Sequence, residues 1–410
     1  MTQAIYQPLT LPNGTTLNNR LAKAAMEENM AASGHLPGES IYRLYQTWAE
    51  GGAGLLITGN VMVDHRAMTG PGGIALESDT PLDPFKEWAN SVHKSNTQIW
   101  MQINHPGRQV YAAMGGKVFS PSDIALDLGK HSKLFGKPQP MAEVEIQELI
   151  QRFVTTATRA VEAGFDGIQI HAAHGYLLSQ FLSPLTNKRQ DQWGGSLENR
   201  ARLLYEVIKA VKTALPTNIV ISVKLNSADF QRGGFDAEDA IKVVEQLGHL
   251  NVDLVELSGG SYESPAMQGN TADGRSLARE AYFLEFAKEI SKKASIPIMT
   301  TGGIFRSEVA NKVVQEGISM VGMGRALAFN PSLPNVWKNS PDTNAVIPVV
   351  NWKDKTLSGV ANMAITKRQL QRMGDGKKPK LNASPVVSLI SDQIRLKKLT
   401  KIYRKRYAAL

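Results

Sequence analysis

Short apolar runs alternate with longer amphipathic segments along most of the chain. The longer segments, such as 41–50, 144–162, 197–214 and 237–247, repeat apolar residues at the spacing of a helix that buries one face. The short runs are Leu21–Ala25, Gly54–Gly59, Ile99–Asn104, Gly167–His171, Ile219–Leu225, Val252–Leu257, Pro297–Gly302 and Ser319–Gly324. A strand followed by a helix is the unit of a parallel sheet, and eight such units predict an α/β protein built as a closed (β/α)8 TIM barrel.

Three segments fall outside this repeat. Residues 9–17 are typical of a β-hairpin that turns at Asn13 and Gly14, and we expect it to plug the N-terminal mouth of the barrel. An insertion at 107–141, rich in Gly, Pro, Ser and Lys, predicts a lid over the active face. We expect residues 1–335 to form the barrel domain and residues 336–410 to form a C-terminal extension, helical and packed on the barrel.

The net charge of +9 arises from residues 377–410 at the end of the chain. Residues 377–410 contain ten of the 46 Lys and Arg residues and one of the 37 acidic residues, so the other 376 residues balance with 36 of each sign. The favoured interpretation is a terminal amphipathic helix with solvated lysines. Its apolar residues expected to pack on the barrel are Ile394, Leu399, Ile402 and Tyr403. A nucleic-acid or membrane-surface role for this basic helix is the alternative.

Composition excludes several classes of protein. The chain has no cysteine, which excludes disulfides, cysteine-ligated zinc, iron–sulfur clusters and thiol nucleophiles. No window reaches the roughly 18 consecutive apolar residues of a membrane span. The first residues lack the basic and apolar regions of a signal peptide. We therefore expect a cytoplasmic protein with no membrane span and no nucleic-acid partner, and we leave a homo-oligomer open.

The most informative motif is His171-Ala-Ala-His174-Gly-Tyr176, directly after the fourth predicted strand. The carboxyl ends of barrel strands carry the active site, because their loops converge on one face. Two imidazole N–H groups there can bind one oxyanion or carbonyl oxygen, and the phenol can supply a proton. The alternatives are a hydrogen-bonded pair of buried histidines or a metal site, and a metal would need a third ligand such as His105.

Other polar or glycine-rich positions lie at the ends of predicted strands. Gly302 and Gly303 close the seventh strand, and Gly324 and Arg325 follow the eighth, a pair of loops that often binds phosphate in barrels. Lys224 lies within the apolar fifth strand and would need an anion if it points into the barrel mouth. Its alternative is a lysine that extends to solvent between helices. Gln102, near the end of the third strand, is either a ligand contact or a polar residue that closes the strand.

The His171–Tyr176 motif, together with 177–181, 183–187 and the Trp-Gly-Gly-Ser run at 193–196, resembles the Old Yellow Enzyme family of flavin-dependent oxidoreductases. The resemblance extends from about Leu9 to about Phe329. It implies FMN as cofactor and NADH or NADPH as the reductant of the flavin. It also implies that the two glycine loops hold the FMN phosphate, while Gln102 and Lys224 contact the flavin pyrimidine.

The same resemblance implies roles for the motif. His171 and His174 would bind the carbonyl or nitro oxygen of a small-molecule substrate, and Tyr176 would protonate its α-carbon after hydride passes from flavin N5 to the β-carbon. The implied activity is reduction of an activated alkene in ping-pong order. Reduction of nitro compounds or nitrate esters, desaturation and isomerisation are alternatives on the same scaffold.

Two positions depart from the family pattern. Glu27, two residues after Ala25 at the end of the first predicted strand, lies where many members have Cys or Thr beside flavin C4=O. An ionised carboxylate there opposes electron uptake, whereas a protonated one donates a hydrogen bond, so we predict an altered flavin potential. Asn60 lies where family members often have a small residue, and we expect a narrower or more polar substrate pocket.

Overall fold

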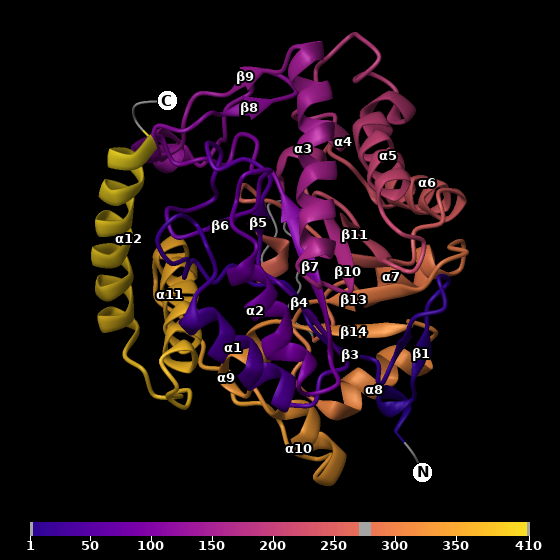
Figure 1. Ribbon diagram of the computed structural model, residues 1–410, viewed down its shortest axis with the longest axis vertical. Helices are drawn as coiled ribbons and strands as arrows, with labels where there is room; N and C mark the ends of the chain where they lie inside the picture. Colours follow the sequence, from indigo (N-terminus) through magenta and orange to yellow (C-terminus); the bar gives the residue numbers. More distant parts are fainter. Residues whose placement is uncertain (1–2, 270–279, 408–410) are drawn as a thin grey trace.

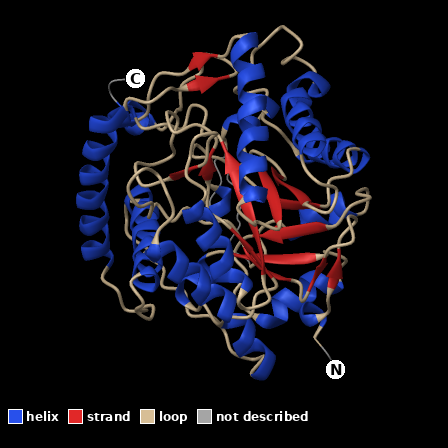
Figure 2. Ribbon diagram, in the orientation of Figure 1, coloured by secondary structure: helices blue, strands red, loops and turns tan. Residues whose placement is uncertain are grey.

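Eight parallel strands close into a barrel in the computed structural model, which describes residues 3–269 and 280–407 (Figures 1 and 2). The barrel strands are β3 (Leu21–Lys23), β4 (Leu55–Ile57), β7 (Gln98–Asn104), β10 (Gly167–Ala172), β11 (Val220–Asn226), β12 (Leu254–Ser258), β13 (Ile298–Thr301) and β14 (Met320–Met323). Each overlaps a predicted strand, and the pairing of β7 with β10 completes the ring. The predicted (β/α)8 barrel is therefore confirmed.

Helices surround the barrel (Figure 2). They are α1 (Glu39–Glu50), α2 (Asp83–His93), α3 (Glu143–Glu162), α4 (Leu177–Leu182), α5 (Leu197–Ala214), α6 (Ala237–His249), α7 (Leu284–Ser291), α8 (Ser307–Gln315) and α9 (Arg325–Phe329). Side chains cap two of these helices, because Ser196 accepts from the Asn199 amide and Asp236 from the Asp239 amide. The predicted helical segments correspond to α1, α3, α5 and α6.

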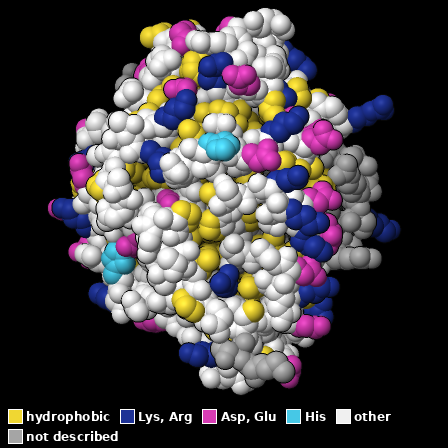
Figure 3. Space-filling view, turned by 90° about the vertical axis from the view of Figure 1, so that its right-hand side faces the viewer, with side chains coloured by type: hydrophobic (Ala, Val, Ile, Leu, Met, Phe, Trp, Pro, Cys, Tyr) yellow, Lys and Arg dark blue, Asp and Glu magenta, His cyan; other side chains and the backbone are white. Residues whose placement is uncertain are grey.

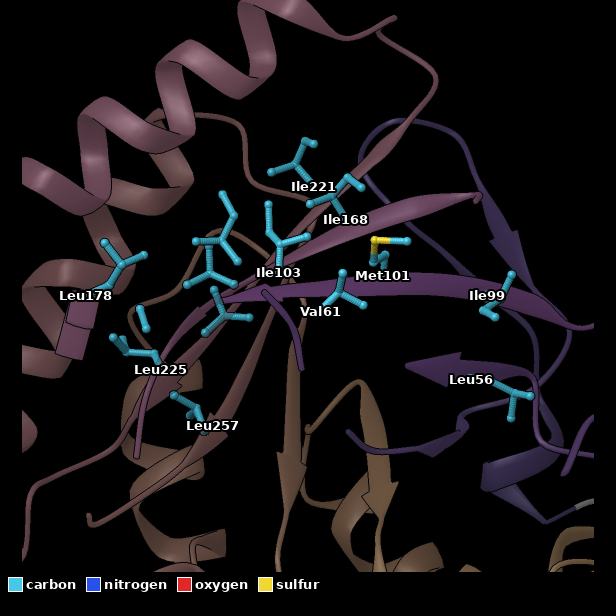
Figure 4. Packing of buried hydrophobic residues seen from close by; sticks show 14 of the residues in the cluster. Leu56, Val61, Ile99, Met101, Ile103, Ile168, Leu178, Ile221, Leu225 and Leu257 are labelled. Atoms are coloured by element: carbon cyan, nitrogen blue, oxygen red, sulfur yellow. The ribbon is translucent and has the colours of Figure 1, made fainter. Parts of the chain in front are cut away.

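Alternate residues of each strand point to opposite sides of the barrel wall. On β7, Ile99, Met101 and Ile103 belong to the apolar layer between strands and helices, as do Ile168 and Ile221 on the next two strands (Figure 4). The residues between them, such as Trp100 and Gln102, point into the barrel. Each aliphatic side chain buried in the outer layer contributes about 1.5–3 kcal/mol, which explains why the strands read as apolar runs.

The N-terminal end of the barrel interior is apolar. The hairpin formed by β1 (Leu9–Thr10) and β2 (Thr16–Leu17) is present, and Gly14 in its turn has a φ of +89°. Its leucines share one buried cluster with inward residues of the strands: Leu9, Leu11, Leu17, Ala22, Leu55, Ile57, Trp100, Val220, Leu254, Met299 and Met320. Above this layer, polar side chains occupy inward positions, as at Gln102, Gln169 and Ser222.

The insertion between β7 and α3 is more ordered than its composition suggests. It contains two 3-10 helices, at Ala112–Met114 and Gly129–Leu134, and the paired strands β8 (Phe119–Ser120) and β9 (Gln139–Pro140). The Tyr111 and Phe135 rings stack with centroids 4.8 Å apart. Two further short strands, β5 (Val61–Met62) and β6 (Ile74–Ala75), extend the sheet beside β7 and were not predicted.

Three helices form the C-terminal part of the chain: α10 (Leu333–Asn339), α11 (Lys355–Gly374) and α12 (Pro385–Tyr407). Helix α10 crosses the boundary that we expected after residue 335. Helix α11 packs against α1, and α12 packs against α11 at the left of Figure 1. In the described part of the chain, no helix is long and apolar enough to cross a membrane.

Helix α12 contacts the rest of the protein mainly through one face. Tyr403 is 3% exposed, its hydroxyl donates to the His65 carbonyl over 2.8 Å, and its ring lies edge-on to His35. Ile394 and Ile402 are 64% and 54% exposed, so the prediction that they pack on the barrel was wrong. The buried residues of α12 are Ser388, Asp392 and Tyr403, with Leu399 half-buried, whereas both isoleucines point to solvent.

On the face of the molecule near α5 and α6, Lys and Arg side chains alternate with Asp and Glu (Figure 3). This mixture agrees with the charge balance of the chain before residue 377. It contrasts with the last turn of α12, which contains Arg404, Lys405 and Arg406.

We predict that Tyr403→Ala loosens α12. Truncation of a buried aromatic side chain costs about 3–5 kcal/mol. A loss of about 3 kcal/mol changes an opening equilibrium by roughly a hundredfold, so tryptic cleavage within α12 should accelerate strongly. Ile394→Ala, on the exposed face, is the matched control and should leave the cleavage rate unchanged. Equal rates for the two variants would contradict this account of the docking.

Candidate active site

The three polar side chains of the histidine motif meet at the carboxyl end of β10. His171 lies on the strand, and the chain then turns sharply, because His174 and Gly175 have φ angles of +61° and +72°. The His171 ring centroid lies 5.1 Å from that of His174 and 4.9 Å from that of Tyr176. The left-handed backbone at His174 is held by Asn226, whose side chain accepts from the His174 amide over 3.0 Å.

Hydrogen bonds orient both imidazoles. Nδ1 of His171 accepts from the Ala173 amide over 3.2 Å, which leaves the proton of a neutral ring on Nε2. Nε2 of His174 lies 2.8 Å from Oγ of Ser258, and if that hydroxyl donates, the ring proton is on Nδ1. Each ring then has one N–H group available for an oxygen atom.

Burial sets the charge of the two histidines. Desolvation lowers the pKa of His171 well below its ordinary value of 6.5, and His174 and Lys224 lower it further. Desolvation and Lys224 likewise lower the pKa of His174 well below that value. Both rings are therefore neutral at pH 7 and act as hydrogen-bond donors without a positive charge.

Tyr176 is buried between two polar neighbours. Its hydroxyl lies 3.3 Å from the Tyr262 hydroxyl and 3.5 Å from Nδ2 of Asn60. Burial, together with the charge of Glu27, raises the pKa of the Tyr176 hydroxyl above its ordinary value of 10.0. Tyr176 therefore keeps its proton at neutral pH and can donate it.

Lys224 and Gln102 point into the barrel and belong to one polar network. Nζ of Lys224 lies 2.7 Å from Oε1 of Glu256, and Nε2 of Gln102 donates to Gln169 over 2.7 Å. Gln169 in turn donates to Glu256 over 2.9 Å. The alternative in which Lys224 extends to solvent is wrong, since the residue is 2% exposed.

The two predicted glycine loops lie on the adjacent strands β13 and β14. Gly302 and Gly303 have φ angles of +145° and +66°, and a Cβ on Gly303 would lie 2.4 Å from the Tyr282 ring. Nη2 of Arg325 donates to the Pro348 carbonyl over 2.8 Å, whereas its buried Nε has no hydrogen-bond partner among the described residues. An anion would satisfy this donor, so the loops suit the phosphate of FMN.

The two consecutive glutamates after β3 point to different environments. Oε1 of Glu27 accepts from Thr69 over 2.7 Å, and Oε2 lies 3.9 Å from Nζ of Lys367 on α11. Glu28 is buried and accepts from the Gly59 amide over 3.0 Å, in the layer between the barrel and α1. Ala25, two residues before Glu27, packs against the inward apolar cluster. Of the two carboxylates, Glu27 is therefore the one on the side of Tyr176.

In the part of the chain that the structure describes, no cluster of three possible metal ligands includes a residue of the histidine motif. Among the described residues, the three ligand groups that come within 4.8 Å of one another are Asp64, His65 and Glu77. Arg66 lies 2.6 Å from Asp64 and Arg152 lies 2.9 Å from Glu77, so arginines already neutralise these carboxylates.

His105, proposed from the sequence as a third metal ligand, accepts from the Gly107 amide at Nδ1 over 3.1 Å. Burial lowers the pKa of His105 to about 4. Its neutral ring thus takes part in the turn that follows β7.

Sequence reasoning missed several polar residues of the site. They are Gln169, Asn226, Glu256, Ser258 and Tyr262. Four of them occupy inward positions on β10, β11 and β12, where they alternate with apolar outward residues. The sequence signal that could have identified these four residues is a polar residue at an alternate position within each apolar run. Tyr262 lies in the loop after β12 and gave no comparable signal.

Comparison with known proteins assigns the family. The model of the NADH:flavin oxidoreductase / NADH oxidase family matches residues 4–344. NADH-dependent flavin oxidoreductase iliE of Hypocrea jecorina (strain QM6a) is 38% identical over 349 residues, which cover 80% of this chain and 87% of that protein. NADPH dehydrogenase of Geobacillus sp. (strain WCH70) is 30% identical over 342 residues, which cover 82% and 93%.

Solved structures agree with this assignment. The old yellow enzyme homologue from Zymomonas mobilis has a TM-score of 0.72 and 26% identity, over 84% of this chain and 95% of that chain. 2-Naphthoyl-CoA reductase has a TM-score of 0.75 and 26% identity, over 82% of this chain and 52% of that chain. The chain thus belongs to the NADH:flavin oxidoreductase / NADH oxidase family, with the Old Yellow Enzyme homologues, as an FMN-dependent oxidoreductase that uses a reduced nicotinamide.

Proposed function

We propose that this enzyme reduces an activated alkene, such as an α,β-unsaturated carbonyl compound, with electrons from NADH or NADPH in ping-pong order. The observation that carries the proposal is the cluster of two neutral imidazoles and a protonated phenol at the carboxyl end of β10. Neutral N–H donors from His171 and His174 bind one substrate oxygen and stabilise the negative charge that develops on it. Tyr176 then donates its proton to the α-carbon.

The cofactor would be held by residues from six strand ends. The backbone of Gly302, Gly303 and Gly324 and the Arg325 side chain would bind its phosphate. Gln102 and Lys224 would contact the flavin pyrimidine, with Ala25, Glu27 and Asn60 beside the ring. When bound, FMN supplies the hydride for the β-carbon of the substrate.

An anaerobic visible spectrum of the purified protein tests the two half-reactions. We expect flavin absorbance that bleaches on addition of NADH or NADPH and returns on addition of cyclohexenone. Absorbance that bleaches but does not return with the enone would contradict alkene reduction, and nitro compounds and nitrate esters would then be tested as oxidants. A protein that takes up no FMN would overturn the proposal as a whole.

Tyr176→Phe should slow only the half-reaction with the enone. Loss of a general acid reduces rates by about 10²–10⁴-fold, while flavin reduction by NADH needs no proton from this residue. Because the pKa of Tyr176 is raised and those of both histidines are lowered, the wild-type rate with enone should stay constant from pH 7 to about 10.

Stopped-flow measurement of each half-reaction separates these effects. Tyr262→Phe is the matched control, since it also removes one hydroxyl from the pair and should have the smaller effect. Equal losses in both half-reactions of Tyr176→Phe would argue against its role as proton donor.

Glu27→Thr should raise the midpoint potential of bound FMN. The substitution removes a carboxylate, and a negative charge near the flavin opposes electron uptake. Lys367→Met should shift the potential in the opposite direction, because it removes the lysine that lies 3.9 Å from Glu27. Spectroscopic redox titration measures both shifts. An unchanged midpoint potential in Glu27→Thr would contradict the proposed position of Glu27 beside the flavin.

A further inference from the structure

Glu256 is a carboxylate in the barrel interior with an exposed fraction of 0%. It lies on β12 and accepts hydrogen bonds from its two neighbouring strands and from β10, the strand beyond β11. Nζ of Lys224 and Oγ1 of Thr301 each lie 2.7 Å from Oε1, and Nε2 of Gln169 lies 2.9 Å from Oε2. The carboxylate therefore has a donor on β10, β11 and β13, and its position is closely defined.

Stability alone does not account for a charge pair at this place. Lys224 is also buried, and taking two charges out of water costs several kcal/mol per ion, or about as much as their attraction returns. Apolar side chains lie lower in the same barrel, with Leu254 one inward position below Glu256 and Val220 two inward positions below Lys224. An apolar pair of similar volume would be at least as stable, so the charged pair points to a role in the site.

The pair lies beside the histidines that bind substrate. In the strand register, His171 is opposite Lys224, and Lys224 is opposite Glu256. The charge of Lys224 contributes to the lowered pKa of both His171 and His174, so it acts on the same pocket. The apolar cluster reaches Leu254, one inward position below Glu256, so the pair lies between this cluster and the carboxyl end of the barrel.

A glycine on β14 makes room for the network. A Cβ on Gly322 would lie 1.9 Å from Oγ1 of Thr301, the hydroxyl that donates to Glu256. Thr301 directly precedes Gly302, the first glycine of the proposed phosphate loop. The network thus links the strand that carries Lys224 to the strand that leads to this loop.

We infer that Glu256 is a positioning residue that holds Lys224 at the flavin and offsets its charge, so that the potential of bound FMN depends on the pair. The inference rests on the proposed placement of Lys224 at the pyrimidine edge. An unpaired lysine there favours electron uptake by the flavin. A carboxylate 2.7 Å from the ammonium group cancels much of that effect.

Redox titration of the FMN-loaded enzyme and three variants tests this inference. Lys224→Met should lower the midpoint potential, and Glu256→Gln, which keeps the shape of the side chain, should raise it. Each shift should correspond to at least a tenfold change in the reduction equilibrium, about 30 mV for a two-electron couple. The double variant Lys224→Met/Glu256→Gln should remain near the wild-type potential, because it removes both charges.

The outcomes separate this inference from the proposed function. If Lys224→Met leaves the potential unchanged, the proposed placement of Lys224 fails. If Lys224→Met lowers it but Glu256→Gln does not raise it, the placement stands and the role of Glu256 is overturned. If Glu256→Gln does not retain FMN, the midpoint potential of Lys224→Met is compared with that of the double variant to test the role of Glu256. An equal potential in those two proteins would also overturn the inference.

Discussion

Closure of the barrel through β7 and β10 is the constraint on which the site depends. The pairing from Gly167 and Trp100 to Ile170 and Ile103 turns a row of parallel strands into a ring. A closed ring has no free edge, and half of its side chains must share a confined interior. It also brings all eight carboxyl ends to one face. Residues far apart in the chain, such as His171 and Arg325, reach one face of the barrel for this reason.

The confined interior also explains the protonation states at the site. Desolvation disfavours the charged form of any group, and it therefore acts in opposite directions on bases and acids. It lowers the pKa of His171 and His174 and raises that of Tyr176. One physical cause thus yields two neutral donors and one retained proton. Groups with these states suit an oxygen that gains negative charge and a carbon that needs a proton.

The sequence determined most of the framework but not the contacts inside it. Strands were predictable because most outward residues are apolar, with Lys23 and Thr300 as exceptions. The motif was recognisable because its residues are neighbours in sequence. The partnership of Lys224 with Glu256 depends on the register of β11 against β12, which no local pattern specifies. Ile394 and Ile402 were misplaced for a related reason. Helix α12 has apolar residues on both faces, and only docking through Tyr403 decides which face is buried.

Glu27, one of the two positions that depart from the family pattern, is contacted by a part of the chain that the family model does not match. That match ends at residue 344, whereas Lys367 lies on α11 and approaches Glu27. Both side chains are partly exposed, at 20% and 26%, so solvent weakens their attraction. The lysine still offsets part of the charge of a carboxylate that also accepts a hydrogen bond from Thr69. Glu27 and the C-terminal extension are therefore coupled by charge, and a change in either alters the electrostatic potential on the side of the barrel where Tyr176 lies.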